Sequence, residues 1–292
     1  MKICTHCGLQ FSDSGWKCPH CKYRPENKNG LDLLAPHLIQ DYRGYKGSFY
    51  DPLSDFEENS FWFEHRASVI LWAYRIFFAK SESFLEVGCG SGRILCSLSS
   101  KFPDISLYGA DILPQGLALA RNRCTDATFF QMDARSMPFI NEFDVIGAFD
   151  VLEHISEDER FLSQLYQAVK PGGGILLTVP QYQWIWSKED ELMTHVRRYS
   201  KRNLFQKVSQ AGFHYLWSSS IFCLVFPAIV FKRKLMPLCG AKKIEFENVI
   251  STPKLLNLFF RALCRFEFSL LETVNRIPFG GSLILAARKE PV

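Results

Sequence analysis

Short apolar runs alternate with longer mixed stretches between residues 84 and 180. The short runs predict buried strands, and the stretches between them predict helices. Strands that are separated by helices predict an α/β fold with a doubly wound parallel sheet, whose ligands bind at the carboxyl ends of the strands. In chain order, the predicted elements are strand 84–87, helix 93–100, strand 106–110, helix 115–123, strand 128–132, strand 143–149, helix 157–169 and strand 174–179.

The rest of the chain extends this sheet and adds segments to it. Two further strands, at 215–221 and 282–287, bring the predicted sheet to seven strands. A helix over 61–78 precedes the first strand, and its aromatic residues suit a core helix better than a lid over a site. Residues 26–58 are rich in Pro, Gly, Asn and Tyr with little periodicity, which predicts a linker. The predicted organisation is an attachment at 1–25, the linker at 26–58 and a main domain at 59–292.

Four cysteines near the N-terminus form two Cys-x-x-Cys pairs that ten residues separate. Four thiolates close a tetrahedral site and leave no position for water, so the predicted metal is a structural zinc ion in a small zinc ribbon. Paired knuckles in so short a stretch favour metal over a redox-active pair, and a ribbon this small needs the metal to fold. His6 and His20 lie inside the two turns and are interpreted as bystanders. The predicted zinc ligands are Cys4, Cys7, Cys18 and Cys21.

A glycine-rich loop follows the first predicted strand of the main domain. Gly88, Gly90 and Gly92 allow a tight turn and a close approach of a ligand to bare backbone, although dinucleotide sites have similar loops. Glu86 precedes the loop, where a carboxylate would repel a pyrophosphate but would support a ligand that bears positive charge. The loop therefore favours a ligand other than a dinucleotide.

Two further carboxylates stand at the ends of the next two strands. Asp111 is placed to accept hydrogen bonds from both hydroxyls of a ribose, and Asp133 is placed to accept one from an adenine amino group. Such acids also serve as helix N-caps. Three carboxylates that converge on one edge of one sheet nevertheless favour a shared ligand.

From about residue 61 to the C-terminus, the chain resembles class I S-adenosylmethionine-dependent methyltransferases. The segments that carry the resemblance are 84–92, 151–155 and 170–173, together with Asp111 and Asp133. It implies a Rossmann-like fold and S-adenosyl-L-methionine as cofactor, with the methionine portion along Glu86 and the glycines. The cofactor-binding residues that it implies are Glu86, Gly88, Cys89, Gly90, Asp111, Ile112, Met132, Asp133, Ala134, Phe149, Asp150 and Leu152.

Two histidines are candidates to take a proton from the methyl acceptor. Methyl transfer is an in-line displacement, so the protein positions the acceptor, excludes water and removes at most one proton. His154 lies just beyond the fourth strand, and His195 lies in the loop after the fifth strand. A supporting or capping role for His154, and an anchoring role for His195, are the alternatives.

Three segments, at 131–135, 148–154 and 195–199, look like a bacterial subgroup that is similar to the ubiquinone-biosynthesis O-methyltransferases. These relatives suggest a divalent metal at three side chains, where hard oxygen ligands would suit magnesium and a catechol-like acceptor. Leu-Glu-His is also common in members with no evident metal requirement. The magnesium ligands in question are Asp150, Glu153 and His154.

An insertion of about sixty residues, 221–280, separates the last two predicted strands. It begins with eleven uncharged residues followed by Lys232-Arg233-Lys234, and the stretch 256–277 has apolar residues at spacings of three and four. An apolar run beside a basic triplet is typical of an interfacial element on an anionic membrane, and it is too short for a span of about 20 residues. The alternatives are a lipophilic acceptor pocket and a helical hairpin that packs on the sheet or in a homodimer.

Charge and cysteine usage add limited information. The chain has 34 Lys and Arg against 30 Asp and Glu, and the resulting +4 does not indicate a nucleic-acid-binding protein. Residues 192–244 hold ten basic residues and no acidic one, so we expect them to face an anionic surface, or else to form a solvated basic face. The N-terminus has no apolar leader and six further cysteines are scattered, which predicts a cytoplasmic protein, peripherally membrane-associated if the insertion docks.

The predicted function is S-adenosylmethionine-dependent O-methylation of a small-molecule or lipid-linked acceptor. The alternative is a ribosomal-RNA methyltransferase that uses the zinc ribbon for RNA recognition. Nucleic acid is the less favoured partner, because RNA recognition needs dense basic and aromatic surface. The basic residues of the ribbon are Lys2, Lys17, Lys22 and Arg24.

Overall fold

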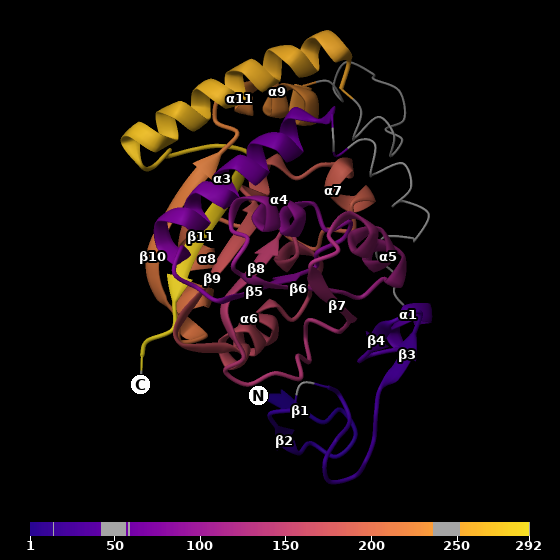
Figure 1. The fold of residues 1–292 in the computed structure, drawn as a ribbon. Coiled ribbons are helices and arrows are strands. Elements are labelled where there is room, and N and C mark those ends of the chain that lie inside the picture. The colour runs from indigo at the N-terminus through magenta and orange to yellow at the C-terminus, as the bar shows by residue number, and fades with distance from the viewer. Residues whose placement is uncertain (14, 42–56, 58, 236–251, 292) are drawn as a thin grey trace.

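The structure is a computed structural model that describes residues 1–13, 15–41, 57, 59–235 and 252–291. Its centre is a sheet with helices on both faces (Figure 1). Within the described residues this sheet has nine strands, in the spatial order β10-β11-β9-β8-β5-β6-β7-β4-β3. The strands are β3 (Glu26–Lys28), β4 (Leu31–Leu33), β5 (Ser83–Val87), β6 (Ser106–Asp111), β7 (Ala127–Gln131), β8 (Phe143–Phe149), β9 (Val169–Pro180), β10 (His214–Ile221) and β11 (Ser282–Arg288).

The predicted seven-stranded sheet is confirmed as the run from β10 to β7. Strands β9, β8, β5, β6 and β7 are parallel, and β11 lies between β9 and β10 and is antiparallel to both. All five residues of β5, at the centre, are buried, because helices cover both faces of a parallel sheet. The carboxyl ends of the parallel strands therefore meet at one edge, where the resemblance places the cofactor.

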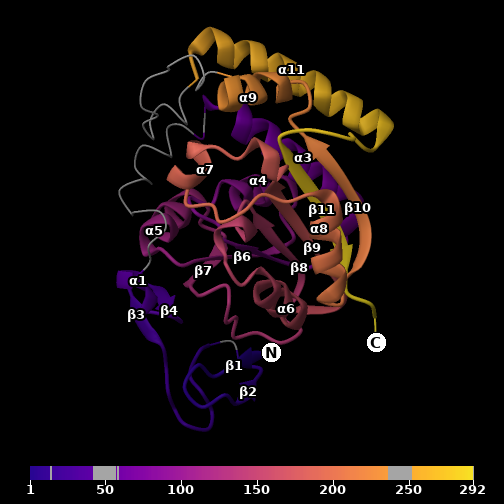
Figure 2. The same ribbon diagram turned by 180° about the vertical axis from the view of Figure 1, so that it is seen from behind.

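Helices cover the two faces of the sheet in separate groups. Helices α3, α4 and α5 cover the face seen in Figure 1, and α6 and α8 cover the face seen in Figure 2. Each group buries one stripe of its residues, as Ile94, Leu95 and Leu98 of α4 do. The bounds are α3 (Phe61–Phe78), α4 (Arg93–Lys101), α5 (Pro114–Arg123), α6 (Asp158–Ala168) and α8 (Lys201–Gln210).

The N-terminal ribbon packs against the main domain. Its hairpin pairs β1 (Lys2–Ile3) with β2 (Gln10–Phe11), and the amide of Ile3 donates to the carbonyl oxygen of Pro138 at 2.9 Å. Trp16 packs its ring against the rings of Phe130 and Phe139, at centroid distances of 6.3 and 5.6 Å. The ribbon therefore shares apolar surface with the sheet domain.

The first part of the predicted linker is ordered structure instead. Strand β4 pairs in parallel with β7, and β3 pairs with β4, so this segment adds two strands to the sheet edge. The side chain of Gln131 fixes the following turn, because it accepts from the amide of Ala35 at 3.0 Å and donates to the Ala35 carbonyl oxygen at 2.9 Å. The linker prediction is corrected for residues 26–35, and its residues 42–56 and 58 lie outside the described residues.

The insertion before the last strand contains helices, as predicted. It comprises α9 (Phe226–Val230), a π-helical turn over Phe231–Leu235 and α11 (Lys254–Val274), and its residues 236–251 lie outside the described residues. Helix α11 lies alongside α3 on the outside of the molecule (Figure 1). No helix in the described part of the chain is long and apolar enough to cross a bilayer.

Helix α11 turns its predicted apolar face away from the protein. The face that contacts the domain contains Cys264, Glu267 and Leu271, all buried. The spacing groups seven apolar residues on one face, of which Leu263 is partly buried and Ile277 is buried. The other five are exposed: Leu256, Phe259, Phe266, Leu270 and Val274. The helix thus has apolar residues on both sides, and one side remains exposed.

The basic segment 192–244 finds acidic partners within the chain. Lys232 pairs with Glu189 at 2.9 Å, and Arg233 pairs with Glu189 at 3.1 Å and also with Asp190. Both acids lie in α7 (Lys188–Leu192), just before the basic segment begins. The expectation that this segment faces an external anionic surface is therefore corrected for Lys232 and Arg233. Three further cations of the segment form ion pairs inside the chain: Arg197, Arg198 and Lys207.

Candidate functional site

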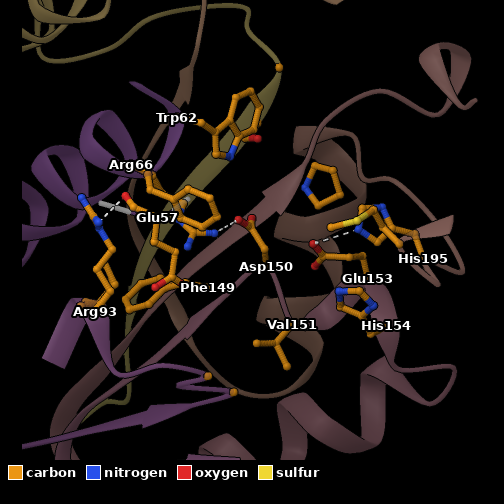
Figure 3. A pocket seen from close by; sticks show the side chains of 18 of the residues that line it. Glu57, Trp62, Arg66, Arg93, Phe149, Asp150, Val151, Glu153, His154 and His195 are labelled. Atoms are coloured by element: carbon orange, nitrogen blue, oxygen red, sulfur yellow. Dashed lines mark hydrogen bonds and ion pairs between the residues drawn. The ribbon is translucent and has the colours of Figure 1, made fainter. Parts of the chain in front are cut away.

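A pocket of about 1030 Å³ lies at the carboxyl ends of β5, β6, β7 and β8. It is roofed by the start of α3, by α9 with the turn that follows it, and by the start of α11. A volume of this size exceeds the several hundred Å³ that a single small ligand needs. The pocket therefore has room for a cofactor at the strand ends and for an acceptor beneath the roof (Figure 3).

The glycine loop forms the floor of the cofactor end. Gly88 has a φ of +72°, and a Cβ atom there would lie 2.4 Å from Cγ2 of Val151, so both the backbone and the close contact require glycine. The amides of Gly88 and Cys89 donate to the carbonyl oxygen of Ala110 at 2.8 and 3.1 Å. These bonds fix the loop against β6.

Asp111 locks the loop to the next strand. One carboxylate oxygen accepts from the amide of Gly90 and the other from the amide of Leu113, both at 2.9 Å. Burial raises the pKa of the carboxyl, and the backbone donors partly offset this. Asp111 lines the pocket where the sequence predicted a ribose contact.

Glu86 is buried beneath the loop with an unsatisfied oxygen. Its Oε2 atom has no hydrogen-bond partner among the described residues. Burial raises the pKa of this carboxyl well above its ordinary value, and the nearby cation of Arg66 opposes that rise. A carboxylate so placed is suited to a ligand that brings a donor or a positive charge.

The predicted adenine end also lines the pocket. Ile112, Met132, Asp133 and Ala134 are among its lining residues. Both carboxylate oxygens of Asp133 accept from the guanidinium of Arg135 at 3.1 Å, and this pairing orients the side chain.

The end of β8 carries a charged pair that sequence reasoning did not find. Asp150, at a φ of +56°, pairs with Arg66 and accepts from the hydroxyl of Thr178 at 3.0 Å (Figure 3). Burial lowers the pKa of Arg66, but Asp150, Glu57 and Glu86 outweigh this and raise it. Arg66 lies on the predicted helix 61–78. Its position as a cation near the start of an otherwise aromatic segment is the sequence feature that could have indicated a site residue.

Two residues of the fourth strand end differ in their placement. Phe149 lines the pocket, but Leu152 does not and is buried in the core on the α6 face of the sheet. A 3₁₀ turn over Leu152–His154 follows β8, and it turns Leu152 inward while Glu153 and His154 face the pocket. Leu152 is therefore corrected from a cofactor contact to a core residue.

The predicted catalytic histidines meet at the other end of the pocket. The rings of His154 and His195 have centroids 4.9 Å apart, and Nε2 of His195 is 4.0 Å from Oε1 of Glu153. Nδ1 of His195 lies 2.9 Å from Oδ1 of Asp190, the acid that also holds Arg198. Burial lowers the pKa of His154 to about 4, and the neighbouring His195 contributes to this.

The donor set suggested for magnesium is not brought together. Glu153 and His154 do lie within metal-binding reach of a third donor, but that donor is His195 rather than Asp150. Asp150 is instead paired with Arg66. The geometry therefore gives no support to magnesium at Asp150, Glu153 and His154.

The acceptor end has apolar walls from three separate segments. Trp62 of α3 stacks on Phe222 at a centroid distance of 3.6 Å, and Trp62 also lines the pocket. Further lining comes from the insertion, so the insertion takes part in the site. Its apolar lining residues are Val225, Ala228, Ile229, Phe231, Leu256 and Phe260.

The four N-terminal cysteines form a compact cluster, which fits the predicted zinc site. The sulfur of Cys4 lies 3.6 Å from that of Cys21, and the sulfur of Cys7 lies 3.7 Å from that of Cys18. Four sulfurs at about 2.3 Å from one ion stand about 3.8 Å apart at the corners of a tetrahedron. The cluster lies in the ribbon, apart from the pocket.

Known proteins share parts of this arrangement. Residues 84–173 match a family model described as a methyltransferase domain. The chain is 28% identical over 98 residues to the demethylmenaquinone methyltransferase of Thermus thermophilus, which covers 32% of this chain and 44% of that protein. The chain spans 30–44% of the length of the first four curated relatives that it matches.

Solved structures share the fold over most of the chain. A complex of a methyltransferase with the Haloferax volcanii Trm112 methyltransferase activator has a TM-score of 0.55 at 17% identity, covering 83% of this chain and 95% of that chain. Phosphoethanolamine N-methyltransferase 2 of Haemonchus contortus, solved with S-adenosyl-L-methionine, has a TM-score of 0.51 at 18% identity, covering 76% and 52%. Residues 84–173 therefore match a methyltransferase domain, and the sheet domain has the Rossmann-like fold of these solved methyltransferase structures.

Proposed function

We propose that this chain is an S-adenosylmethionine-dependent methyltransferase that acts on the oxygen of an acceptor with an apolar portion. The observation that carries the proposal is the set formed by the glycine loop, Asp111 and the unsatisfied oxygen of Glu86 at adjoining strand ends. Bound S-adenosyl-L-methionine would supply an activated methyl group on a positively charged sulfur. Glu86 suits the charged methionine portion, and Asp111 suits the ribose.

The chain's part in the reaction is positioning and proton removal. The walls around Trp62 and Ile229 would hold the acceptor and exclude water. The same lining would direct the acceptor oxygen toward the methyl group that bound S-adenosyl-L-methionine would supply. The acceptor oxygen would then be held close to the methyl group and in line with it, as the displacement requires. The acceptor's proton leaves toward the end of the pocket that holds Glu153, His154 and His195.

An apolar acceptor is supported by the composition of the roof. The lining from α9 and α11 is aliphatic and aromatic, and one relative is named for methylation of demethylmenaquinone. The same helix, α11, continues from the pocket onto the exposed apolar face of the molecule. We infer that a lipid-linked acceptor reaches the site along this helix. No described feature favours the ribosomal-RNA alternative.

Substitution of Asp111 with asparagine tests cofactor binding. Loss of charge-assisted hydrogen bonds worth about 1.5–3 kcal/mol should weaken S-adenosyl-L-methionine binding roughly 10- to 150-fold. Isothermal titration calorimetry measures the affinity, and thermal unfolding checks that the buried side chain is still accommodated. Asp104→Asn, an exposed acid before β6, is the matched control and should bind as the wild type does. Equal affinity of folded Asp111→Asn and wild type would contradict the ribose assignment.

A second variant tests peripheral contact with a lipid surface. Phe259 and Phe266 are 58% and 64% exposed, so a Phe259→Ser/Phe266→Ser double variant should lose about 2 kcal/mol of apolar partitioning, roughly thirty-fold. Sedimentation with vesicles of phosphatidylcholine and phosphatidylglycerol measures the bound fraction. The control, Val196→Ser/Phe205→Ser, removes exposed apolar residues elsewhere and should leave binding unchanged.

Two outcomes would decide against this lipid contact. Wild-type protein that does not sediment with vesicles would contradict it directly. Analytical ultracentrifugation tests the alternative. A wild-type dimer that becomes a monomer in the Phe259→Ser/Phe266→Ser variant would instead assign the exposed face of α11 to a homodimer interface. Substitution of Lys232 should matter little for vesicle binding, because its ammonium group is paired with Glu189.

A further inference from the structure

Three metal-ligating side chains from two separate segments converge at the acceptor end of the pocket. Glu153 and His154 follow β8, and His195 comes from the loop after α7. One donor atom from each lies within 4.8 Å of the others, and all three residues line the pocket. We call this set the Glu153 cluster.

Glu153 is buried, and Nε2 of His195 lies 4.0 Å from its Oε1 atom. The residue is 1% exposed, and neither of its carboxylate oxygens has a hydrogen-bond partner in the described part of the chain. A buried carboxylate is normally paired or bound to a cation, because its desolvation is otherwise uncompensated. The unsatisfied oxygens face two imidazoles, which are themselves metal ligands.

His195 is oriented as a metal-binding imidazole. Its Nδ1 lies 2.9 Å from Oδ1 of Asp190, and Asp190 is fixed in turn by Nε of Arg198 at 2.7 Å and by the amide of Ser187 at 3.0 Å. A proton on Nδ1 that is donated to Asp190 leaves the lone pair on Nε2, the atom that faces Glu153. A carboxylate behind a ligating histidine is the arrangement that fixes the tautomer in known metal sites.

We propose that Glu153, His154 and His195 bind one divalent transition-metal ion at the acceptor end of the pocket. Two nitrogens and one carboxylate oxygen suit zinc, iron(II), manganese(II) or cobalt(II) better than magnesium, which prefers a full set of oxygens. Three protein ligands leave coordination positions open toward the pocket. The inference rests on the proposed function for its purpose, since an acceptor oxygen would occupy an open position, but the ion site stands on its own geometry.

Cobalt(II) titration tests the site without any acceptor. The full-length protein is first dialysed against a weak chelator until its remaining zinc is bound by the cysteine cluster alone. Added cobalt(II) should then bind with one further equivalent and give d–d absorption without a thiolate charge-transfer band, because the Glu153 cluster has no sulfur donor. Cobalt that gives the charge-transfer band has instead replaced zinc at the cysteines.

Matched variants assign the bound ion to the cluster. Glu153→Gln and His195→Gln should each weaken cobalt binding more than about 100-fold, since even a residue that only supports a ligand is worth 10–100-fold. The controls are Glu159→Gln and His214→Gln, which change exposed residues and should leave the affinity unchanged. Thermal unfolding confirms that each variant is folded.

The outcomes separate this inference from the proposed function. Absence of a second equivalent of cobalt, or equal binding by Glu153→Gln, His195→Gln and the controls, would overturn the metal site. S-adenosyl-L-methionine affinity is measured by calorimetry on the same preparations. Binding of the cofactor without cobalt would support the proposed function and contradict the metal site. Binding of cobalt without the cofactor would support the metal site and contradict the proposed function.

Discussion

Replacement of Cys4 and Cys18 with serine is expected to leave the chain with one zinc ion fewer than the wild type and to unfold the ribbon. The two residues belong to different Cys-x-x-Cys pairs, and both are buried in the small cluster that also contains Phe11. Structural zinc contributes about 10–16 kcal/mol in peptides of this size, far more than a core of so few residues supplies. Without the metal, the packing of Trp16 against Phe130 and Phe139 should also be lost.

The measurement is zinc content per chain by elemental analysis, with circular dichroism and proteolysis to follow the ribbon. Cys96→Ser/Cys223→Ser is the matched control, since both thiols are partly buried and lie outside the cluster. That control should retain its zinc and its protease resistance. Zinc retained at the wild-type level in Cys4→Ser/Cys18→Ser would refute the four-cysteine site.

The sheet could be predicted from the sequence because its strands are buried on both faces. An apolar run such as the one that ends at Val87 is readily assigned to a buried strand once helices flank it. The candidate site residues then fall at the carboxyl ends of these strands. The glycine loop was predictable for a similar reason, since Gly88 needs a positive φ and has no room for a Cβ. A steric requirement at one backbone position can be recognised from the residue type at that position.

The strands β3 and β4 could not be predicted in the same way. Each is three residues long, and β3 is exposed throughout, so neither gives a periodic signal. Strand β4 pairs through its backbone with β7, about 100 positions away, and the side chain of Gln131 bonds Ala35 in the turn that follows. Pairing between short strands that lie far apart in the chain leaves little trace in a local pattern.

The acidic partners of the basic segment could not be predicted either, because they lie far from Lys232 and Arg233 in the sequence. The segment 192–244 has no acid of its own, and its run of cations resembles a surface for an external anion. In the fold, Lys232 and Arg233 lie against Glu189, about 43 residues upstream. Helix α11 shows a related limit, because spacing identifies an apolar face but does not state which side contacts the domain.

Glu267→Gln is expected to lower the free energy of unfolding by about 1–3 kcal/mol, the usual effect of leaving a buried hydrogen-bond donor without its acceptor. Glu267 is 1% exposed, and Oε1 lies 3.0 Å from Nε2 of His65 and accepts from the amide of Phe222 at 2.6 Å. Oε2 accepts from the amide of Leu224 at 2.9 Å. Glutamine would turn the NH2 group of its side-chain amide toward one of these donors, so at least one buried backbone N–H would lose its acceptor.

This carboxylate joins α11 to α3 and to the segment that leads into α9, so the same substitution should loosen the roof of the pocket. Urea denaturation measures the stability, and hydrogen exchange at the amides of Phe222 and Leu224 reports the roof. Glu272→Gln is the matched control on the same helix, because its pair with Arg75 at 3.6 Å is exposed and worth about 0–1 kcal/mol. Similar losses in the two variants would show that Glu267 does not hold the roof, whereas a large loss confined to Glu267→Gln, with faster exchange at both amides, would show that one buried side chain keeps the insertion closed over the site.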